Sequence, residues 1–403
     1  MNDTINYMLE LGYTKFEINK ILNNLIAHRY KKETLGNKIE LIYNHLLEKF
    51  KSKEMVIYVT VKYPQVVGLS KDKIDSIYKY LYNLYHNDEI VLKIIKGSPN
   101  VFGFSEKTLD DKIDEYVKLG YTRNELLKMC IECPRIFGIS IDNFKQKLAD
   151  IKEMGFDDKE TIKISKAQPT IFSSGVGSIE EKKNHFIELG YTKEEVNKMI
   201  KLVPSLISHS INHTDDRYNF LLNLGYTKEE IIKMTIDLPC IYTYAIENME
   251  DKIKDLEELG FSHDEVLIMI RKVPAIFSYS INSIKEKIEM LKELEISEED
   301  IKSMCVNFPG ILNGDKETLR EKLLYFIEIN LLDKIIENPK HLRQGVRLTY
   351  ARYEYYKYIG KEVDESNFVR LFEGQKTFEK SKGIKKEDLI ARFNYDERER
   401  GRR

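Results

Sequence analysis

The sequence has little of what membrane proteins, secreted proteins or enzymes display. No stretch approaches 18 uncharged apolar residues, so no membrane-spanning helix is expected. Only four cysteines occur, without dense spacing, which is typical of a reducing compartment. Asp3 and Glu10 stand near the N-terminus, so neither a secretory signal nor an acidic-poor transit peptide is visible. We therefore expect a cytoplasmic protein, with an organellar location left open.

Sequence signatures of catalysis are also missing. The chain shows no glycine-rich phosphate loop, no nucleophile elbow and no paired histidine–carboxylate motif. Cys130 and Cys133 are spaced like zinc ligands, but they occupy positions that other repeats fill with aliphatic residues, and no second pair exists. His209 and His213 need not share a helix face. We expect no enzyme, no cofactor and no metal.

Proline is scarce as well, but its placement is informative. The chain has nine prolines, and eight of them recur at one interval of 35 residues. Such self-similarity is the signature of a repeat architecture. The ninth, Pro339, follows after 30 residues and indicates a degenerate end. The eight are Pro64, Pro99, Pro134, Pro169, Pro204, Pro239, Pro274 and Pro309.

Each proline lies between two predicted helices. In the repeat that begins at Leu224, Gly225 suits the left-handed residue just past a helix end. Thr227 with Glu230 then predicts a capping box that starts the first helix. Pro239 ends that helix, and a second amphipathic helix follows. The same box is predicted at Thr122 and Glu125, Thr192 and Glu195, and Ser262 and Glu265.

No single repeat can bury both of its apolar faces, so stacking is required. We predict an all-α superhelical solenoid of about eight repeats, elongated and monomeric. The expected organisation is an N-terminal capping repeat over 1–49, the array over 50–338, and a basic capping segment and tail over 339–403.

The repeat pattern resembles that of the mTERF family, the mitochondrial transcription termination factors. The segment LGYTKEEVNKMIKLVPSLISHSI, from Leu189 to Ile211, is a close likeness, and the resemblance covers about residues 50–330. It implies a left-handed solenoid. It also implies binding of double-stranded DNA, or in some members RNA, with a role in transcription or organellar gene expression.

Two sets of cations are candidates for phosphate contact. The first lies thirteen residues after the prolines, in the second helix beside its apolar stripe; the first repeat has Ile77 there. Its alternative role is to shield the core with its methylene stem. This set comprises Lys112, Lys147, Lys182, Arg217, Lys252, Lys287 and Lys322.

The second set lies six residues before the prolines, in the first helix. It lapses at Ile268 and Ser303, and such lysines are otherwise a solvated face. It comprises Lys93, Lys128, Lys163, Lys198 and Lys233.

The C-terminal segment adds Arg343, Arg347 and Arg352 to the candidates. RLTYARYEYYKY (Arg347 to Tyr358) interleaves cations with aromatic residues, which suits nucleic-acid contact, or it forms a helix that closes the last repeat.

Charge leaves two functions open. Residues 334–403 hold 18 Lys and Arg against 12 Asp and Glu, a net of +6, whereas the other 333 residues carry a net of −8. A nucleic-acid-binding solenoid, with double-stranded DNA favoured over RNA, is the first hypothesis. A scaffold that holds a peptide or a partner protein in the solenoid groove is the alternative.

Overall fold

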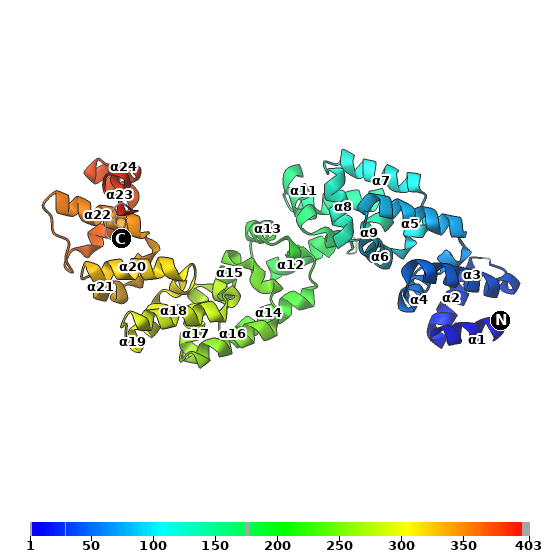
Figure 1. Cartoon of the computed structure of the whole chain (residues 1–403), viewed down its shortest axis with the longest axis horizontal. Helices are drawn as coiled ribbons and strands as arrows, with labels where there is room; N and C mark the ends of the chain where they lie inside the picture. Colours follow the sequence, from blue (N-terminus) through cyan, green and yellow to red (C-terminus); the bar gives the residue numbers. More distant parts are fainter. Residues whose placement is uncertain (1, 29, 174–177, 397–403) are drawn as a thin grey trace. The chain divides into compact units, whose positions relative to one another are not determined.

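The computed structural model describes residues 2–28, 30–173 and 178–396, and every regular element in these ranges is helical. The predicted all-α repeat fold is confirmed. The chain divides into two compact units, residues 1–212 and 213–403, and each is described by itself. Figure 1 follows the helices from blue at the N-terminus to red at the C-terminus.

Every predicted first helix has ten residues and ends two residues before its proline. The residue before the proline takes one non-helical conformation throughout, for example φ −136° and ψ 75° at Tyr63, because the proline ring disfavours the helical region there. The first helices are α4 (Lys53–Lys62), α6 (Asp88–Gly97), α8 (Arg123–Glu132), α11 (Asp158–Ala167), α13 (Lys193–Leu202), α15 (Lys228–Asp237), α17 (His263–Lys272) and α19 (Glu298–Asn307).

A single helical turn follows at each proline, which we call the prolyl turn. It is a 3₁₀ helix in all repeats but one, where α9 replaces it. The prolyl turns are η1 (Pro64–Gly68), η2 (Pro99–Gly103), α9 (Arg135–Gly138), η3 (Pro169–Ser173), η4 (Pro204–Ile207), η5 (Pro239–Thr243), η6 (Pro274–Ser278) and η7 (Pro309–Leu312).

The second helix of each repeat begins after the prolyl turn. These helices are α5 (Lys71–Tyr85), α7 (Glu106–Lys118), α10 (Ile141–Glu153), α12 (Ser178–Glu188), α14 (Ile211–Asn223), α16 (Ile246–Glu258), α18 (Ile281–Glu293) and α20 (Lys316–Glu328).

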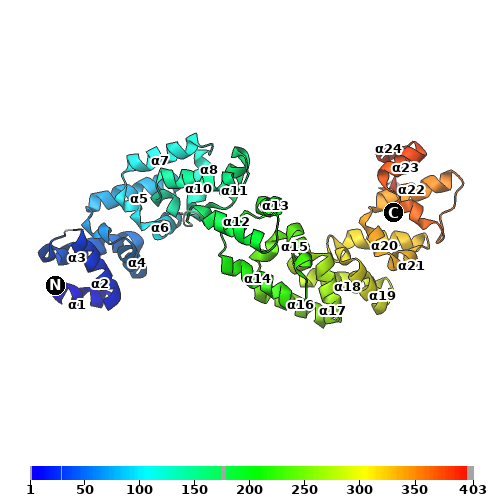
Figure 2. The same ribbon diagram turned by 180° about the vertical axis from the view of Figure 1, so that it is seen from behind.

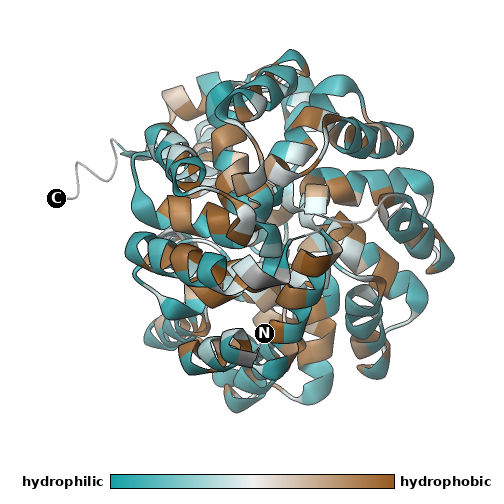
Figure 3. Ribbon diagram, turned by 90° about the vertical axis from the view of Figure 1, so that its right-hand side faces the viewer, coloured by the Kyte–Doolittle hydropathy of each residue, from teal (hydrophilic) through white to brown (hydrophobic). Residues whose placement is uncertain are grey.

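Helices of the same kind pack on one another in consecutive repeats. In the first unit α4 packs on α6, α6 packs on α8, and α5 packs on α7. In the second unit α16 and α18 lie side by side from both viewpoints (Figures 1 and 2). Figure 3 shows hydrophobic and hydrophilic residues on different faces of the same helices. Each apolar face is thus buried by a neighbouring helix, as a repeat array requires.

The predicted signals at the helix ends are confirmed. All four predicted capping boxes form, at Thr122, Thr192, Thr227 and Ser262. Gly225 has φ +91°, a left-handed conformation that glycine adopts without the strain of a Cβ.

The two ends of the chain complete the array. The N-terminal helices are α1 (Asn2–Leu11), α2 (Lys15–Ala27) and α3 (Lys32–Phe50). At the other end the repeat geometry continues past the predicted degenerate end. The shortened helix α21 (Leu332–Glu337) leads to a further prolyl turn, η8 (Pro339–Arg343), and then to a second helix, α22 (Val346–Tyr358). The last elements are η9 (Phe368–Phe372), α23 (Gln375–Lys382) and α24 (Lys386–Arg392).

Candidate nucleic-acid interface

The cations thirteen residues after the prolines bind backbone carbonyls of the next repeat. Lys112 shows the arrangement: its Nζ donates to Phe137 O and to Ile139 O, each at 2.9 Å. These carbonyls end a prolyl turn, where they lack helical partners and carry the negative end of the helix dipole. A lysine at this register therefore fastens its own second helix to the turn of the following repeat.

Four more of the seven predicted cations make the same contact. We call all seven, which share one position in the repeat, the clasp cations. The carbonyl acceptors always belong to the next prolyl turn or the residue after it. The bonds are Lys182 Nζ to Ile207 O at 2.7 Å, Arg217 Nε to Tyr244 O at 3.0 Å, Lys252 Nζ to Tyr279 O at 2.6 Å and Lys322 Nζ to Leu342 O at 2.8 Å.

The two remaining clasp cations are deeply buried. Lys147 is 3% exposed and its Nζ lies 3.7 Å from Asp150 Oδ2, while Lys287 is 1% exposed and donates to Ser283 Oγ at 2.7 Å. Burial lowers the pKa of both amines, and likewise that of Lys112. None of the seven belongs to the exposed surface. Phosphate contact by these residues stays a prediction, and their amines are already engaged within the fold.

Sequence reasoning missed two members of this arrangement. In the first repeat, where Ile77 stands at the clasp register, Lys73 one helical turn earlier donates to Phe104 O instead. Arg352 lies thirteen residues after Pro339 and is therefore the clasp cation of the last repeat. The spacing from Pro339 was the available signal.

Arg352 is the most heavily bonded of these cations. It is 1% exposed, and its Nη1 donates to Leu371 O at 2.8 Å and to Glu373 O at 2.7 Å. Its guanidinium carbon lies 4.6 Å from the centroid of the Phe378 ring. Burial lowers the pKa of this arginine. Arg352 was predicted as a nucleic-acid contact, and its guanidinium is enclosed by the C-terminal helices.

The other two predicted arginines are exposed. Arg347 pairs with Asp396 at 3.1 Å. Arg343 lies over the Phe308 ring, 5.0 Å from its centroid, and lines a cavity described below. Two tyrosines of α22, Tyr350 and Tyr353, make edge-to-face contacts with Tyr325 of α20. The segment therefore closes the last repeat, as the alternative for it predicted.

The second predicted set, which we call the first-helix lysines, has the opposite character. All five are exposed, and within the described part of the chain none makes an ion pair or a side-chain hydrogen bond. Four of them belong to the first unit and one to the second. They stand on α6, α8, α11, α13 and α15 as Lys93, Lys128, Lys163, Lys198 and Lys233.

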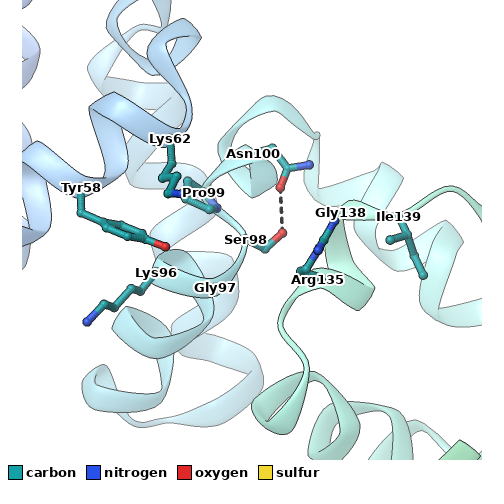
Figure 4. Close-up of a pocket in the computed structure, with 10 residues that line it drawn as sticks. All are labelled: Tyr58, Lys62, Lys96, Gly97, Ser98, Pro99, Asn100, Arg135, Gly138 and Ile139. Carbon is teal, nitrogen blue, oxygen red and sulfur yellow. Dashed lines mark hydrogen bonds between the residues drawn. The ribbon is translucent and has the colours of Figure 1, made fainter. Parts of the chain in front are cut away.

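Each unit also has a basic cavity at the same place in the repeat, beside the carboxyl ends of consecutive first helices. In the first unit this cavity measures about 470 Å³ and is lined by Lys62, Lys96 and Arg135 (Figure 4). In the second unit it measures about 420 Å³, and a single carboxylate is among its described lining residues. The cations around the second cavity are Lys233, Arg271, Lys272 and Arg343.

The residues considered for metal binding have structural roles. Cys130 and Cys133 are both 3% exposed and pack in the core, as their positions predicted. His213 Nε2 lies 2.9 Å from Tyr242 O. Among the described residues no three His, Cys, Asp or Glu side chains gather in a way that could hold a metal ion. No described helix has the length and apolar character needed to cross a bilayer.

These features define an all-α helical-repeat protein with exposed, regularly spaced lysines. Comparison with protein families gives its family: the mTERF model matches residues 1–151, 143–257 and 249–370. The chain belongs to the mTERF family, as the repeat pattern indicated. This family binds nucleic acid and acts in transcription. A search of curated proteins finds no match.

Proposed function

We propose that this protein binds double-stranded DNA through the first-helix lysines and acts in transcription or its termination. The observation that carries the proposal is a single exposed lysine at one register of consecutive first helices, without a partner among the described residues. Phosphate neutralisation by lysine and arginine supplies most of the affinity of proteins for nucleic acid.

The spacing of these lysines suits a phosphate backbone. Packed helices lie roughly 8–10 Å apart, and phosphates on one DNA strand recur about every 3.4 Å. Within the first unit, consecutive lysines would therefore contact about every third phosphate of one strand. These lysines are Lys93, Lys128, Lys163 and Lys198.

Two triple variants test the assignment against each other. Lys128→Gln, Lys163→Gln and Lys198→Gln removes exposed charge, whereas Lys182→Gln, Arg217→Gln and Lys252→Gln removes clasp cations. Binding to duplex DNA is measured by fluorescence anisotropy over a range of salt concentrations, beside RNA and single-stranded DNA. Each lost duplex contact should lower the salt slope by about 0.9, so the first variant should lose up to roughly three.

The second variant should bind duplex with an unchanged salt slope and should be less stable. If the salt slope instead fell in the second variant and stayed unchanged in the first, the clasp cations would be the phosphate contacts and our assignment would be wrong. If the parent bound no nucleic acid at all, the proposal would fail. The net charge of −8 over residues 1–333 would then favour a basic peptide or protein partner.

A further inference from the structure

The cavity of the first unit differs from that of the second because no carboxylate is among its described lining residues. It lies between α4, α6 and the turn α9, and its described lining contains three cations and no carboxylate. A volume of about 470 Å³ falls within the size range of small-ligand sites. The pocket is therefore large enough to hold a whole small anion.

Two of its three cations lie beside an aromatic ring. Lys62 Nζ lies 5.8 Å and Lys96 Nζ lies 5.9 Å from the centroid of the Tyr58 ring. Tyr58 is 36% exposed, so part of the ring faces solvent. Figure 4 shows Tyr58 and Lys62 on one side of the pocket and Arg135 on the other. The site thus combines positive charge with a flat apolar surface.

Arg135 has donors to spare. One of its terminal nitrogens, Nη1, donates to Ser173 O at 3.3 Å, and its other N–H groups have no partner among the described residues. A guanidinium group binds phosphate oxygens with two parallel N–H bonds. This geometry favours a phosphate over a compact inorganic anion such as chloride.

An amide completes the pocket. Ser98 is 3% exposed, and its hydroxyl donates to Asn100 Oδ1 at 2.8 Å, which fixes the side chain and leaves Nδ2 to donate. Gly138 keeps this corner open, because a Cβ there would lie 2.7 Å from Ser98 Oγ and 2.8 Å from the Asn100 amide. Asparagine amides are well suited to hydrogen bonding with the edge of a base.

From these parts we infer that the pocket binds a nucleotide phosphomonoester, with Lys62 and Arg135 on the phosphate, Lys96 adding positive charge at the rim, and Tyr58 against the base. A monoester carries close to two negative charges, whereas a backbone diester carries one, and three cations without a carboxylate match the higher charge. The ligand is either a free nucleotide or the 5′-phosphorylated end of a strand. The second source rests on the proposed function, and the first does not.

The experiment compares these two sources directly. Calorimetry measures binding of adenosine 5′-monophosphate, with inorganic phosphate alongside. Anisotropy measures a ten-nucleotide DNA strand with a 5′-phosphate against the same strand with a 5′-hydroxyl. The proteins are the full chain, the variant Lys62→Gln with Arg135→Gln, and a charge-matched control, Lys118→Gln with Lys254→Gln. The two control lysines have side chains 70% and 74% exposed, and neither is among the residues that line the pocket.

We expect the parent and the control to bind at least one phosphorylated probe, the monophosphate or the 5′-phosphorylated strand. The affinity of the pocket variant for that probe should be lower by about tenfold or more, because charged hydrogen bonds are lost. Binding of the mononucleotide alone would assign a free nucleotide, and strand-end discrimination alone would assign a strand end. A second variant, Tyr58→Leu, should weaken the mononucleotide and leave inorganic phosphate unchanged.

The inference is overturned if the parent neither binds adenosine 5′-monophosphate nor prefers the 5′-phosphorylated strand, or if the pocket variant binds as the control does. Its failure is separable from that of the proposed function. The triple variant of the first-helix lysines should retain mononucleotide binding while its affinity for duplex DNA falls. The pocket variant should retain the salt dependence of duplex binding.

Discussion

The Lys166 amine donates to Glu125 Oε1 across 2.6 Å and so joins α11 to the carboxylate that caps α8. The other oxygen of Glu125 accepts the backbone N–H of Thr122 at 2.9 Å. One side chain therefore starts a helix and holds the next repeat. The pairs Glu160 with Lys201 and Glu230 with Arg271 repeat the arrangement.

This double use predicts a pH-dependent stability. Hydrogen bonds from Lys166 and then from Thr122 lower the pKa of Glu125 from its usual value of 4.5 to about 2. A lowered folded-state pKa stabilises the fold above the unfolded value, and the contribution is lost as the pH falls through the folded value. We expect Glu125→Gln to be less stable than the parent at pH 7, by a difference that shrinks between pH 4.5 and 2.

Urea unfolding at several pH values measures this difference. The control is Glu195→Gln, which removes a capping-box carboxylate without an ion-pair partner among the described residues. A gap between Glu125→Gln and the parent that stayed constant down to pH 2 would contradict the assignment of the lowered pKa.

The clasp cations predict a second difference in stability. Lys112→Met leaves two carbonyls without a charged donor and should lower the free energy of unfolding by about 1–3 kcal/mol. Lys93→Met removes an exposed lysine and should change it by no more than about 0.5 kcal/mol. Denaturant midpoints with equal slopes check both. Equal effects of the two variants would mean that the clasp contributes nothing.

Arg352 predicts that lysine cannot replace arginine at the last clasp position. The fork of its guanidinium serves two carbonyls and the Gln375 side chain, a pattern that a single amine does not reproduce. Arg352→Lys should destabilise by about 2 kcal/mol or more. The exposed Arg347→Lys should change stability by about 0.5 kcal/mol or less. Thermal melting of the two variants decides, and overlapping curves would refute the prediction.

The glycine register predicts substitutions of opposite sign. Gly225 has φ +91° and no atom within 4 Å of an added Cβ, so Gly225→Val should cost about 1 kcal/mol or more through backbone strain alone. Glu295 stands at the same register with φ +61°. Glu295→Gly should therefore stabilise by up to about 1 kcal/mol. Calorimetric melting of both variants tests this, and a shift of the same sign in both would count against it.

Much of the fold follows from the sequence because its signals are local. Pro239 excludes the helical conformation from the residue before it, and Thr227 with Glu230 starts a helix, whatever lies elsewhere. The register of the clasp cations was equally visible. Their acceptors were not, because a carbonyl is present at every residue and only packing selects Phe137 O for Lys112.

The remaining differences come from shifts in spacing. Pro339 follows after 30 residues because α21 has six residues where other first helices have ten, and the connection before it is one residue shorter than that before α19. That shift removed Arg352 from the 35-residue register. Lys73 stands one helical turn from the expected position and reaches the next turn all the same. The pocket around Tyr58 joins residues from three repeats, which no single-repeat motif displays.

The clasp has a consequence for how the repeats can diverge. Its acceptor is the main chain, so substitutions at Phe137, Ile139 or Tyr244 leave the acceptor atom in place. The hydrogen bond itself does not depend on the side chain of the acceptor residue, and on the donor side it needs only a long cation. Neighbouring repeats can therefore drift apart in sequence, or be duplicated whole, without a compensating change in their partner.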